Sequence, residues 1–361
     1  MELRLYEDSL KSYEDNSAAE LVVKYGEDSL AYLTLEEGKE YFFGKNVEGF
    51  IAYVVVEKVA VCVGNSVCSK DNTTELLQEF EEYCKRRRYK ICFCSITKEM
   101  AKVLKQRGFS ISKYGEEALI DLRVYELAGS KTSKLRQKLK RAEKSGINIV
   151  EYRPKEERDL SLEKKIYKVS EEWFAKKNGR LTLTLGELNL DNPLRRRYFV
   201  ALDEAEEVKA ILMFSPFCSG KGYFLDVMRR TQNSVPGVME KAIIDAAMQF
   251  KSEGAEWVSL GLAPLSGIEV EKGKVTLLEK GMSFMYNNMN KHYGFKTLHE
   301  YKKKFAPTNW EPRYVAHEQN LLPFKVAYVM IKARNVDDMW KQLMAGLWKA
   351  GRAFLTVEKK Q

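Results

Sequence analysis

The chain is predicted to adopt a mixed α/β (α+β) fold in which one strand–helix unit occurs twice. Short apolar runs, several of them alternating with polar residues, are typical of strands. Segments between them carry apolar residues three and four positions apart, which is typical of amphipathic helices. The order strand, loop, helix, strand, helix and Gly-Phe is found in both halves of the 361 residues, so we interpret the halves as a duplication.

The first half begins with short strands and continues with two helices. Expected strands cover residues 29–35, 40–45, 49–56, 58–65, 89–96 and 110–122. Apolar spacing predicts one helix over 72–88, with Asn72 and Glu75 as a capping pair. A second helix over 98–108 ends at Gly108, because glycine is favoured just after a helix.

The second half repeats that order. Its expected strands cover 209–218, 222–230 and 256–264, and its helices cover 237–254 and 282–294. By analogy of pattern, this order matches the acetyltransferase (GNAT) fold used twice, with mixed and mostly antiparallel sheets. The predicted divisions are a GNAT-like domain over 1–128, a basic connecting helix over 129–150, a GNAT-like catalytic domain over 151–320 and a helical tail over 321–361.

Composition and charge narrow the class of protein. Hydrophobic residues make up 45% of the chain and charged residues 31%, so a sizeable core is expected and global disorder is not. The formal net charge of +9 favours an anionic partner, either nucleic acid, an acidic membrane surface or a phosphorylated substrate. A solvated basic surface without a partner is the alternative.

Cysteine usage and the N-terminus indicate the compartment. The six cysteines form no C-x-x-C pair and have no histidine cluster nearby, so free thiols are expected and a zinc site is not. The N-terminus is acidic and lacks a signal-peptide core. No apolar run approaches the ~20 residues that span a bilayer. We therefore expect a soluble or peripheral protein, although the chain could also be a piece of a longer membrane protein.

The connecting helix is strongly basic. Its cations face a single acid, Glu143, and Gly146 is a natural cap for its C-terminus. Those cations are Lys131, Lys134, Arg136, Lys138, Lys140, Arg141 and Lys144. So many like charges on one helix repel each other, which is a cost that a surface without a partner has no reason to keep. Docking of a polyanion is therefore the functional interpretation. A solvated connecting helix is the alternative.

An acid and two arginines stand out in the strand predicted over 222–230. Asp226 lies in an apolar run and is followed by Arg229 and Arg230. Asp226 and Arg229 face opposite sides of an extended strand, unless a bulge or turn at Val227–Met228 brings them together. A buried structural ion pair is the alternative to a site.

The loop after this strand is where an acetyltransferase holds the pyrophosphate of its cofactor, at the start of the next helix. Close approach of backbone to phosphate requires glycine, and this loop offers only Gly237. Binding of coenzyme A is therefore a weaker interpretation of the loop.

Several motifs in register carry a family resemblance. They are "LDVMRR", "VPGVMEKAI", "GAEWVSLGLAPLSG", "KYGEEALIDL", "SKLRQKLKRAEKSGI" and "YGFKTLHEYKKKFAPTNWEPRYVA". Over roughly residues 20–320 the chain resembles the C-terminal cytosolic domain of the aminoacyl-phosphatidylglycerol synthases, also called lysylphosphatidylglycerol synthetases or multiple peptide resistance factors. The ending "HYGFKTL" departs from the family, which has an Asn and a Gln-Gly there.

The resemblance implies a tandem GNAT-like fold shared with the Fem peptidyl-bridge transferases. It implies transfer of a lysyl or alanyl group from charged tRNA to the headgroup of phosphatidylglycerol, without coenzyme A, metal or ATP. The implied partners are aminoacyl-tRNA, phosphatidylglycerol in an anionic membrane, and a membrane-spanning region upstream or on a separate chain. The implied location is cytoplasmic, at the inner face of the cell membrane.

Site roles follow from the resemblance together with the chemistry of ester-to-ester transfer. Asp226 is expected to accept the hydroxyl proton or hold the substrate ammonium, and Arg229, with Arg230 as a second candidate, to bind phosphate. The remaining candidates are Lys302 and Lys304 on one face of a strand for phosphate or the oxyanion, Glu116 and Glu117 for an amino group, and Ser259 in the pocket. A solvated lysine run on an edge strand is the alternative for the two lysines, and a structural pair is the alternative for the two glutamates. For the basic helix, the resemblance names tRNA as the polyanion bound by Lys134, Arg136, Lys138, Lys140 and Arg141.

Three other functions are kept open. They are tRNA-dependent transfer to a peptide or peptidoglycan acceptor, coenzyme A-dependent N-acyl transfer, and a non-catalytic module that binds RNA or membrane. The tail adds a possible membrane contact, because its apolar residues fall on one helical face flanked by cations; packing against the protein body is the alternative. That face comprises Trp340, Leu343, Met344, Leu347, Trp348, Gly351 and Phe354.

Overall fold

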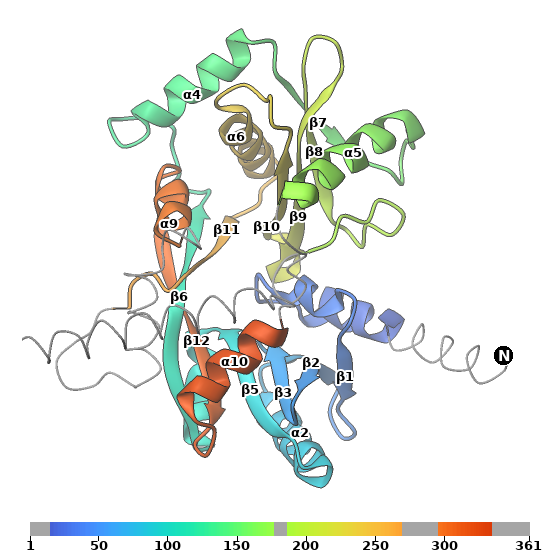
Figure 1. Ribbon diagram of the computed structural model, residues 1–361, viewed down its shortest axis with the longest axis vertical. Helices are drawn as coiled ribbons and strands as arrows, with labels where there is room; N and C mark the ends of the chain where they lie inside the picture. The colour runs from blue at the N-terminus through green and yellow to red at the C-terminus, as the bar shows by residue number, and fades with distance from the viewer. Residues whose placement is uncertain (1–14, 177–185, 269–294, 334–361) are drawn as a thin grey trace, which may run out of the picture.

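The computed structural model describes residues 15–176, 186–268 and 295–333, and within them twelve strands form one continuous sheet (Figure 1). The strands are β1 Glu40–Phe43, β2 Gly49–Val56, β3 Val59–Val63, β4 Val67–Cys68, β5 Lys90–Ile96, β6 Phe109–Asp121, β7 Asn148–Tyr152, β8 Arg197–Leu202, β9 Val208–Phe217, β10 Gly222–Arg230, β11 Trp257–Pro264 and β12 Asn309–Glu318. Their order is β1-β2-β3-β5-β12-β6-β11-β10-β9-β8-β7, with β4 beside β2. All neighbours are antiparallel except β3·β5 and β10·β11, which confirms a mixed, mostly antiparallel sheet.

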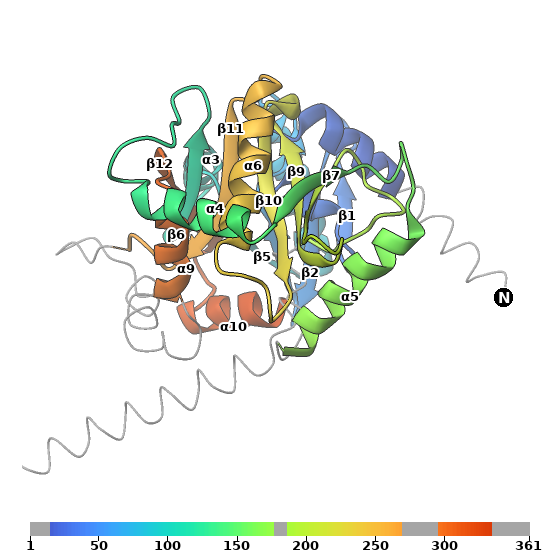
Figure 2. The ribbon, with the colours of Figure 1, turned by 90° about the horizontal axis from the view of Figure 1, so that it is seen from above.

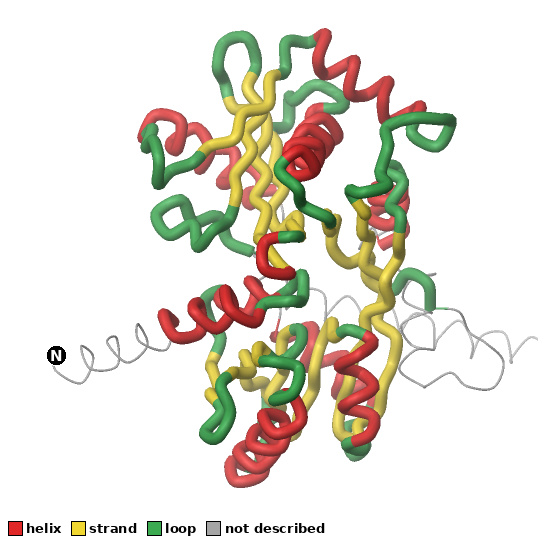
Figure 3. Tube along the Cα trace, turned by 180° about the vertical axis from the view of Figure 1, so that it is seen from behind, coloured by secondary structure: helices red, strands yellow, loops and turns green. Residues whose placement is uncertain are grey.

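Helices lie on both faces of this sheet, as the views from above and from behind show (Figures 2 and 3). They are α2 Thr73–Arg87, α3 Lys98–Gln106, α4 Ser133–Lys144, α5 Leu160–Lys176, α6 Val238–Ser252, α9 Phe295–Lys303 and α10 Pro323–Ala333, together with the 3-10 helices η1 Ala31–Leu35 and η2 Cys218–Gly220. Residues 15–25 are also helical. Among the helices of the described ranges, none combines the length and apolarity that crossing a bilayer requires.

The two parallel strand pairs reflect the repeated unit. Helix α2 connects β3 and β4 to β5, and α6 connects β10 to β11, so each half contains a parallel pair with a helical crossover. The end of the repeat differs between the halves, because Phe109 begins β6 whereas Phe295 begins α9. The helix predicted over 282–294 lies outside the described residues.

The long strand β6 joins the halves into one sheet. It pairs with β12 along one edge and with β11 along the other. Strand β12 comes from the last part of the described chain, yet it lies between β5 and β6 of the first half. The sheet is therefore shared between both halves, and the domain boundaries drawn from the sequence stay a prediction.

Three local predictions were wrong. Residues 29–35 contain η1 in place of a strand, and a run buried on all sides, such as Ala31–Thr34, fits either state by sequence alone. Asn72 does not cap α2 through its side chain, because its own backbone is already helical. Lys302 lies in the last turn of α9, so the strand predicted to carry Lys302 and Lys304 does not exist.

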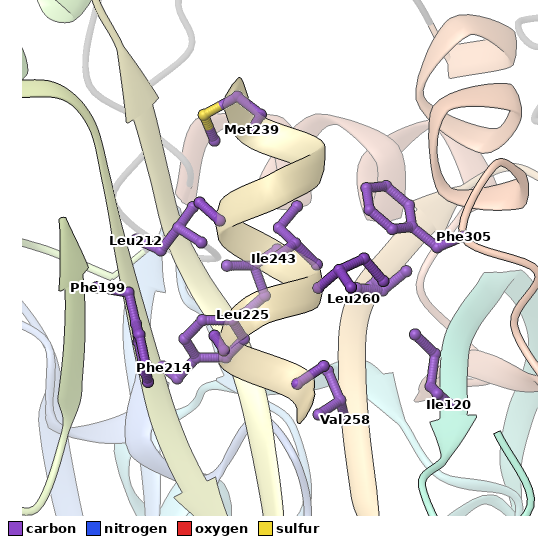
Figure 4. Close-up of a cluster of buried hydrophobic side chains, with 14 of the residues drawn as sticks. Ile120, Phe199, Leu212, Phe214, Leu225, Met239, Ile243, Val258, Leu260 and Phe305 are labelled. Carbon is purple, nitrogen blue, oxygen red and sulfur yellow. The ribbon is translucent and has the colours of Figure 1, made fainter. Parts of the chain in front are cut away.

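The largest core lies between α6 and the sheet (Figure 4). Leu212, Leu225 and Val258 from three neighbouring strands meet Ile243 of α6 there. Phe250 of α6 is fully buried, and its ring stacks on Tyr223 with the ring centroids 4.0 Å apart. This packing fixes α6, and with it the two strands that α6 connects.

Replacing Phe250 by alanine is expected to lower the free energy of unfolding by about 3–5 kcal/mol, because the deletion leaves a cavity among packed rings. Urea denaturation of the whole chain measures the change. The control Leu160→Ala removes an exposed side chain and is expected to change stability by no more than about 0.5 kcal/mol. Equal losses in the two variants would contradict this account of the core.

Candidate functional site

The site is centred where the parallel strands β10 and β11 part. They pair only from Gly222 to Phe224 on β10; beyond that, the register of β10 runs along β9 and that of β11 along β6. A cavity lies at the parting, lined by Leu225, Met228, Ile243, Leu260, Tyr301, Lys302 and Phe305. In α/β proteins, ligands bind outside the carboxyl ends of strands at such points.

Lys302 supplies the buried amine of this cavity. Its Nζ donates a 2.6 Å hydrogen bond to the carbonyl of Leu262, in β11. Burial lowers the pKa of Lys302 to about 7, although the charge of Glu117 acts in the opposite direction. A large fraction of this amine is therefore uncharged near neutral pH and able to accept a proton.

Gly261 makes room for the Lys302 amine. Its φ of 81° is left-handed, and a Cβ at this position would lie 3.4 Å from Nζ of Lys302 and 3.1 Å from the ring of Phe224. Glycine satisfies both the backbone and the space requirement here. Gly261, which the family motif includes, thus has a role in shaping the cavity.

Tyr301 lies beside Lys302 and presents a different chemistry. Its hydroxyl is buried and has no hydrogen-bond partner among the residues that the structure describes. Lys304 lies over the Tyr301 ring, with its Nζ 5.3 Å from the centroid, and the charge of Arg230 also acts on the phenol. Both of these cations are exposed, so they flank the cavity-lining tyrosine from the solvent side.

Glu117 and Ser259 belong to a buried cluster with Arg313. Glu117 accepts hydrogen bonds from Ser259 Oγ and from Arg313 Nε, the latter at 2.7 Å. Arg313 also forms a 2.7 Å ion pair with Asp28. Burial alone would raise the pKa of Glu117, but Arg313 and the hydrogen bonds hold it below its ordinary value. The carboxylate is thus ionised and held by its own chain.

Glu116 is not part of that cluster. Successive side chains of a strand point to opposite faces, so Glu116 lies on the other face of β6 from Glu117. Its carboxylate forms a 2.7 Å ion pair with Lys113. The Nζ of Lys113 also donates to the carbonyl of Gly267. The structure therefore separates the two glutamates that the sequence offered together.

Asp226 lies at a β-bulge. The register of β10 against β9 shifts between Leu225 and Val227, one residue before the predicted position. Asp226 lies on the face of the sheet that carries Ser215, which donates a 3.0 Å hydrogen bond to Oδ2, and the bulge brings the following residue, Val227, to that same face. The backbone N–H of Gly186 donates to Oδ1 at 2.7 Å. Both carboxylate oxygens are thus already engaged.

A charged network surrounds Asp226 on this face. Arg196 forms a 2.7 Å ion pair with Glu36, and its charge also acts on Asp226. Burial raises the pKa of Asp226 and of Glu36, against the charge of Arg196. Burial lowers the pKa of Lys39 to about 8, against the charge of Glu36. Two acids and two cations share this buried space.

Arg229 contacts aromatic rings of α5. Its guanidinium lies 4.3 Å from the ring centroid of Phe174 and 5.7 Å from that of Trp173. The bulge thus puts Asp226 and Arg229 on one face, as the sequence allowed. The ring contacts of Arg229 are with α5, whereas Asp226 accepts hydrogen bonds from Gly186 and Ser215. Arg230, at the exposed end of the strand, donates to Ser234 at 2.9 Å.

Sequence reasoning did not identify Arg196, Arg313, Glu36 or Lys39. Arg313 lies inside the quoted motif "WEPRY", and Arg196 lies inside the arginine run "LRRRY". Both arginines therefore stand in stretches that the sequence makes conspicuous. Their counter-ions lie 160 or more positions away in the chain, and no local pattern links such partners.

The basic helix α4 divides into engaged and exposed cations. Arg136 donates to the carbonyls of Leu127 and Gly129, and Lys138 forms an ion pair with Glu240 of α6. Lys134, Lys140 and Arg141 are exposed. Gly146 follows the helix with a φ of 71°, as predicted for its cap.

The start of α6 is covered by α4. Gly237 precedes α6 with a φ of 98°, and a Cβ there would collide with the backbone carbonyl of Lys138. The first turn of α6 therefore faces the backbone of another helix. This contact leaves less room at the place where an acetyltransferase holds a pyrophosphate.

Comparison with known proteins gives the family. The profile of the family "Phosphatidylglycerol lysyltransferase, C-terminal" matches residues 19–317. A phosphatidylglycerol lysyltransferase of Staphylococcus epidermidis is 25% identical over 302 residues, which cover 83% of this chain and 35% of that protein. An uncharacterized protein of Corynebacterium glutamicum is 27% identical over 310 residues, 83% of this chain and 38% of that protein. The chain thus spans little more than a third of the curated relatives that it matches.

Solved structures share the fold. The structure of L-PGS from Bacillus licheniformis matches with a TM-score of 0.76 and 23% identity, covering 89% of this chain and 96% of that one. The C-terminal domain of an Agrobacterium fabrum protein described as a lysylphosphatidylglycerol synthetase matches with a TM-score of 0.75 and 22% identity, with the same coverage. FemX matches more distantly, with a TM-score of 0.53 and 11% identity over 87% of this chain and 98% of that one.

The profile match extends from the helix before η1 to the penultimate residue of β12, and so includes the parting of β10 and β11 and both buried charge clusters. The chain belongs to the family of phosphatidylglycerol lysyltransferase C-terminal domains.

Proposed function

We propose that the chain transfers an aminoacyl group from charged tRNA to a glycerol hydroxyl of phosphatidylglycerol. The observation that carries the proposal is the buried Lys302 amine in the cavity between β10 and β11, in a family whose named members are phosphatidylglycerol lysyltransferases. The proposed setting is the inner face of the cell membrane, together with a membrane-spanning region upstream or on a separate chain.

The proposed step exchanges one ester for another. The glycerol oxygen forms a bond to the aminoacyl carbonyl carbon, and the bond from that carbon to the ribose oxygen of tRNA breaks. Lys302 takes the hydroxyl proton as the attack proceeds and returns it to the departing ribose oxygen. The hydroxyl of Tyr301, which has no hydrogen-bond partner in the part of the chain that the structure describes, donates a hydrogen bond to the carbonyl oxygen, where negative charge develops.

The exposed cations beside Tyr301 fit a phosphate group. Arg230 and Lys304 flank the phenol, and we assign them to a phosphate of the lipid headgroup or of tRNA. Arg229, held over aromatic rings of α5, is a further candidate for such a contact. Of the two predicted lysines, we assign the proton transfer to Lys302, because Lys302 is buried with a lowered pKa whereas Lys304 is exposed.

We assign positioning roles to the buried polar groups that do not line the cavity. Asp226 holds Gly186 and Ser215 with both oxygens, so we assign it to ordering the chain there in place of accepting the hydroxyl proton. Glu117 and Ser259 have a similar part on β6 and β11, since Ser259 Oγ also accepts the N–H of Gly261 beside the Lys302 amine. Glu116 stays a candidate for contact with an amino group of the substrate.

The direct test supplies tRNA charged with labelled lysine or alanine to the purified chain, together with vesicles that contain phosphatidylglycerol. Label is expected in the extracted lipid. Label in a peptidoglycan precursor would show that this precursor, and not phosphatidylglycerol, is the acceptor. Label in neither acceptor would contradict the proposal.

Lys302→Met tests the proton acceptor. Transfer is expected to fall by roughly 100-fold or more, because the variant lacks the proton acceptor. The fold is expected to stay intact, because an apolar side chain is tolerated in place of a buried amine. The amine works in its uncharged form and has a pKa of about 7, so kcat/KM of the unchanged protein should rise about tenfold per pH unit below neutrality and level off above it. The pH–rate profile of the two proteins measures both effects.

The neighbouring exposed Lys303 provides the matched control. Lys303→Met is expected to keep both the rate and the inflection near pH 7. A Lys302→Met protein that keeps the inflection would contradict the assignment, as would a larger loss in Lys304→Met than in Lys302→Met.

The exposed face of α4 is proposed to bind tRNA. Replacing Lys134, Lys140 and Arg141 by glutamate is expected to weaken tRNA binding at least roughly tenfold, and to lower the slope of log affinity against log salt by about two to three. Filter binding at several salt concentrations measures both quantities. Arg86→Glu/Arg88→Glu, at the end of α2, reverses exposed charges elsewhere and should leave tRNA binding within about twofold; equal losses would remove the assignment to α4.

A further inference from the structure

A second basic surface lies at the opposite end of the long axis from α4 (Figure 1). We call it the basal surface and define it by the β2–β3 turn (57–58), the end of α2 with the start of β5 (85–90), and the β12–α10 connection (318–325). Hydrogen bonds and ion pairs join the three segments. The N–H of Lys90 donates to the carbonyl of Lys58, and the Lys90 ammonium lies 3.1 Å from Glu318. Lys325 pairs with Glu57.

Two large apolar side chains protrude from the basal surface. Leu322 is 58% exposed and Phe324 is 64% exposed, on either side of Pro323 at the start of α10. Their neighbours Leu321 and Val326 are buried, and the N–H of Leu321 closes the turn onto the carbonyl of Glu318. The connection is therefore anchored while the leucine and the phenylalanine face solvent. Apolar side chains exposed together in this way mark a contact with a protein or a membrane.

The three segments of the basal surface are also rich in cations. The three segments hold two carboxylates, Glu57 and Glu318, and seven cations: Lys58, Lys85, Arg86, Arg87, Arg88, Lys90 and Lys325. Both carboxylates are already bound, Glu57 by Lys325 and Tyr328, and Glu318 by Lys90 and the N–H of Ile91. Exposed positive charge thus remains on Lys58, Lys85, Arg86 and Arg88.

We infer that the basal surface docks on an anionic lipid membrane, with Leu322 and Phe324 in the interface and the cations against the headgroups. Exposed apolar side chains together with basic residues are what interfacial membrane contacts use. RNA would be held by phosphate contacts and by stacking on free rings. Here Tyr83 lies under the Arg87 guanidinium and Tyr328 donates to Glu57. The exposed ring of Phe324 is accompanied by the aliphatic Leu322, which offers no stacking surface, so the pair favours lipid as the occupant.

The inference rests on the lipid acceptor proposed above, and it adds the face by which the chain reaches the membrane. With α4 at one end and the basal surface at the other, a polyanionic donor and an anionic membrane meet different ends of the molecule (Figure 1). Neither partner then has to displace the other from a shared set of cations.

Co-sedimentation of the full chain with vesicles tests the inference, without any tRNA. Binding is expected with vesicles of phosphatidylglycerol and phosphatidylcholine, and much weaker binding with phosphatidylcholine alone. Leu322→Ser/Phe324→Ser should lower the partition coefficient on the mixed vesicles by roughly tenfold or more. Arg86→Glu/Arg88→Glu should remove most of the preference for anionic vesicles.

The control Val124→Ser/Leu160→Ser changes two apolar residues that are each 69% exposed and lie in other parts of the chain, so its vesicle binding should match that of the unchanged protein. Circular dichroism of each variant checks the fold. Vesicle binding by Leu322→Ser/Phe324→Ser at the unchanged level would overturn the inference. Loss of tRNA binding in that variant, with vesicle binding kept, would assign the surface to RNA.

Failure of the proposed function is distinguishable from failure of this inference. Vesicle binding through the basal surface without any transfer of label would leave the inference in place and remove the transfer reaction. Transfer to detergent-dispersed phosphatidylglycerol, with unchanged vesicle binding in Leu322→Ser/Phe324→Ser, would leave the transfer reaction in place and remove the inference.

Discussion

The parting of β10 and β11 is the constraint on which the site depends. Two parallel strands that stay paired leave no space between them, and here the pairing stops after Phe224. Beyond that point each strand departs from regular pairing: β10 bulges at Asp226, and β11 shifts its register against β6 between Ser259 and Leu262. The Lys302 amine enters the region so opened and bonds to a β11 carbonyl.

Such an opening needs support on both sides, because strands that lose their partner would otherwise leave polar groups unsatisfied. On one side, Arg313 of β12 ties Glu117 of β6 to Asp28. On the other side, Arg196 ties Glu36 to the surroundings of Asp226. Asp28 and Glu36 flank η1, so one short segment near the N-terminus contributes an acid to each cluster. The wrongly predicted strand at 29–35 is thus the connection between the two supports of the cavity.

Sequence patterns predicted local features well, but they did not predict which residues distant in the chain pair with each other. Strand β10, helix α6 and strand β11 were predicted nearly at their observed bounds, because apolar periodicity and the glycines around α6 are local signals. The bulge was foreseen as a condition for bringing Asp226 and Arg229 to one face, and it occurs one residue earlier. Lys302 was selected, but with the wrong geometry, since "YKKKF" reads equally as a strand or as the end of a helix. Arg196 and Glu36 were missed because pairing across 160 residues depends on the tertiary fold.

The loop between β10 and α6 shows how one contact changes the meaning of a sequence. With a single glycine it looked poorly suited to hold a pyrophosphate, and the contact of Gly237 with the Lys138 carbonyl gives a physical reason. A helix start that packs on another backbone cannot also enclose a phosphate chain at the same point. The Lys138–Glu240 ion pair fixes α4 there, so the basic helix is joined to the helix that crosses between the two parting strands. A polyanion bound to the exposed face of α4 would then rest on an element directly connected to β10 and β11. Under the proposed function, the helix that α4 contacts is also one that lines the cavity, through Ile243, and its start is the place where a single acetyltransferase unit would bind a cofactor.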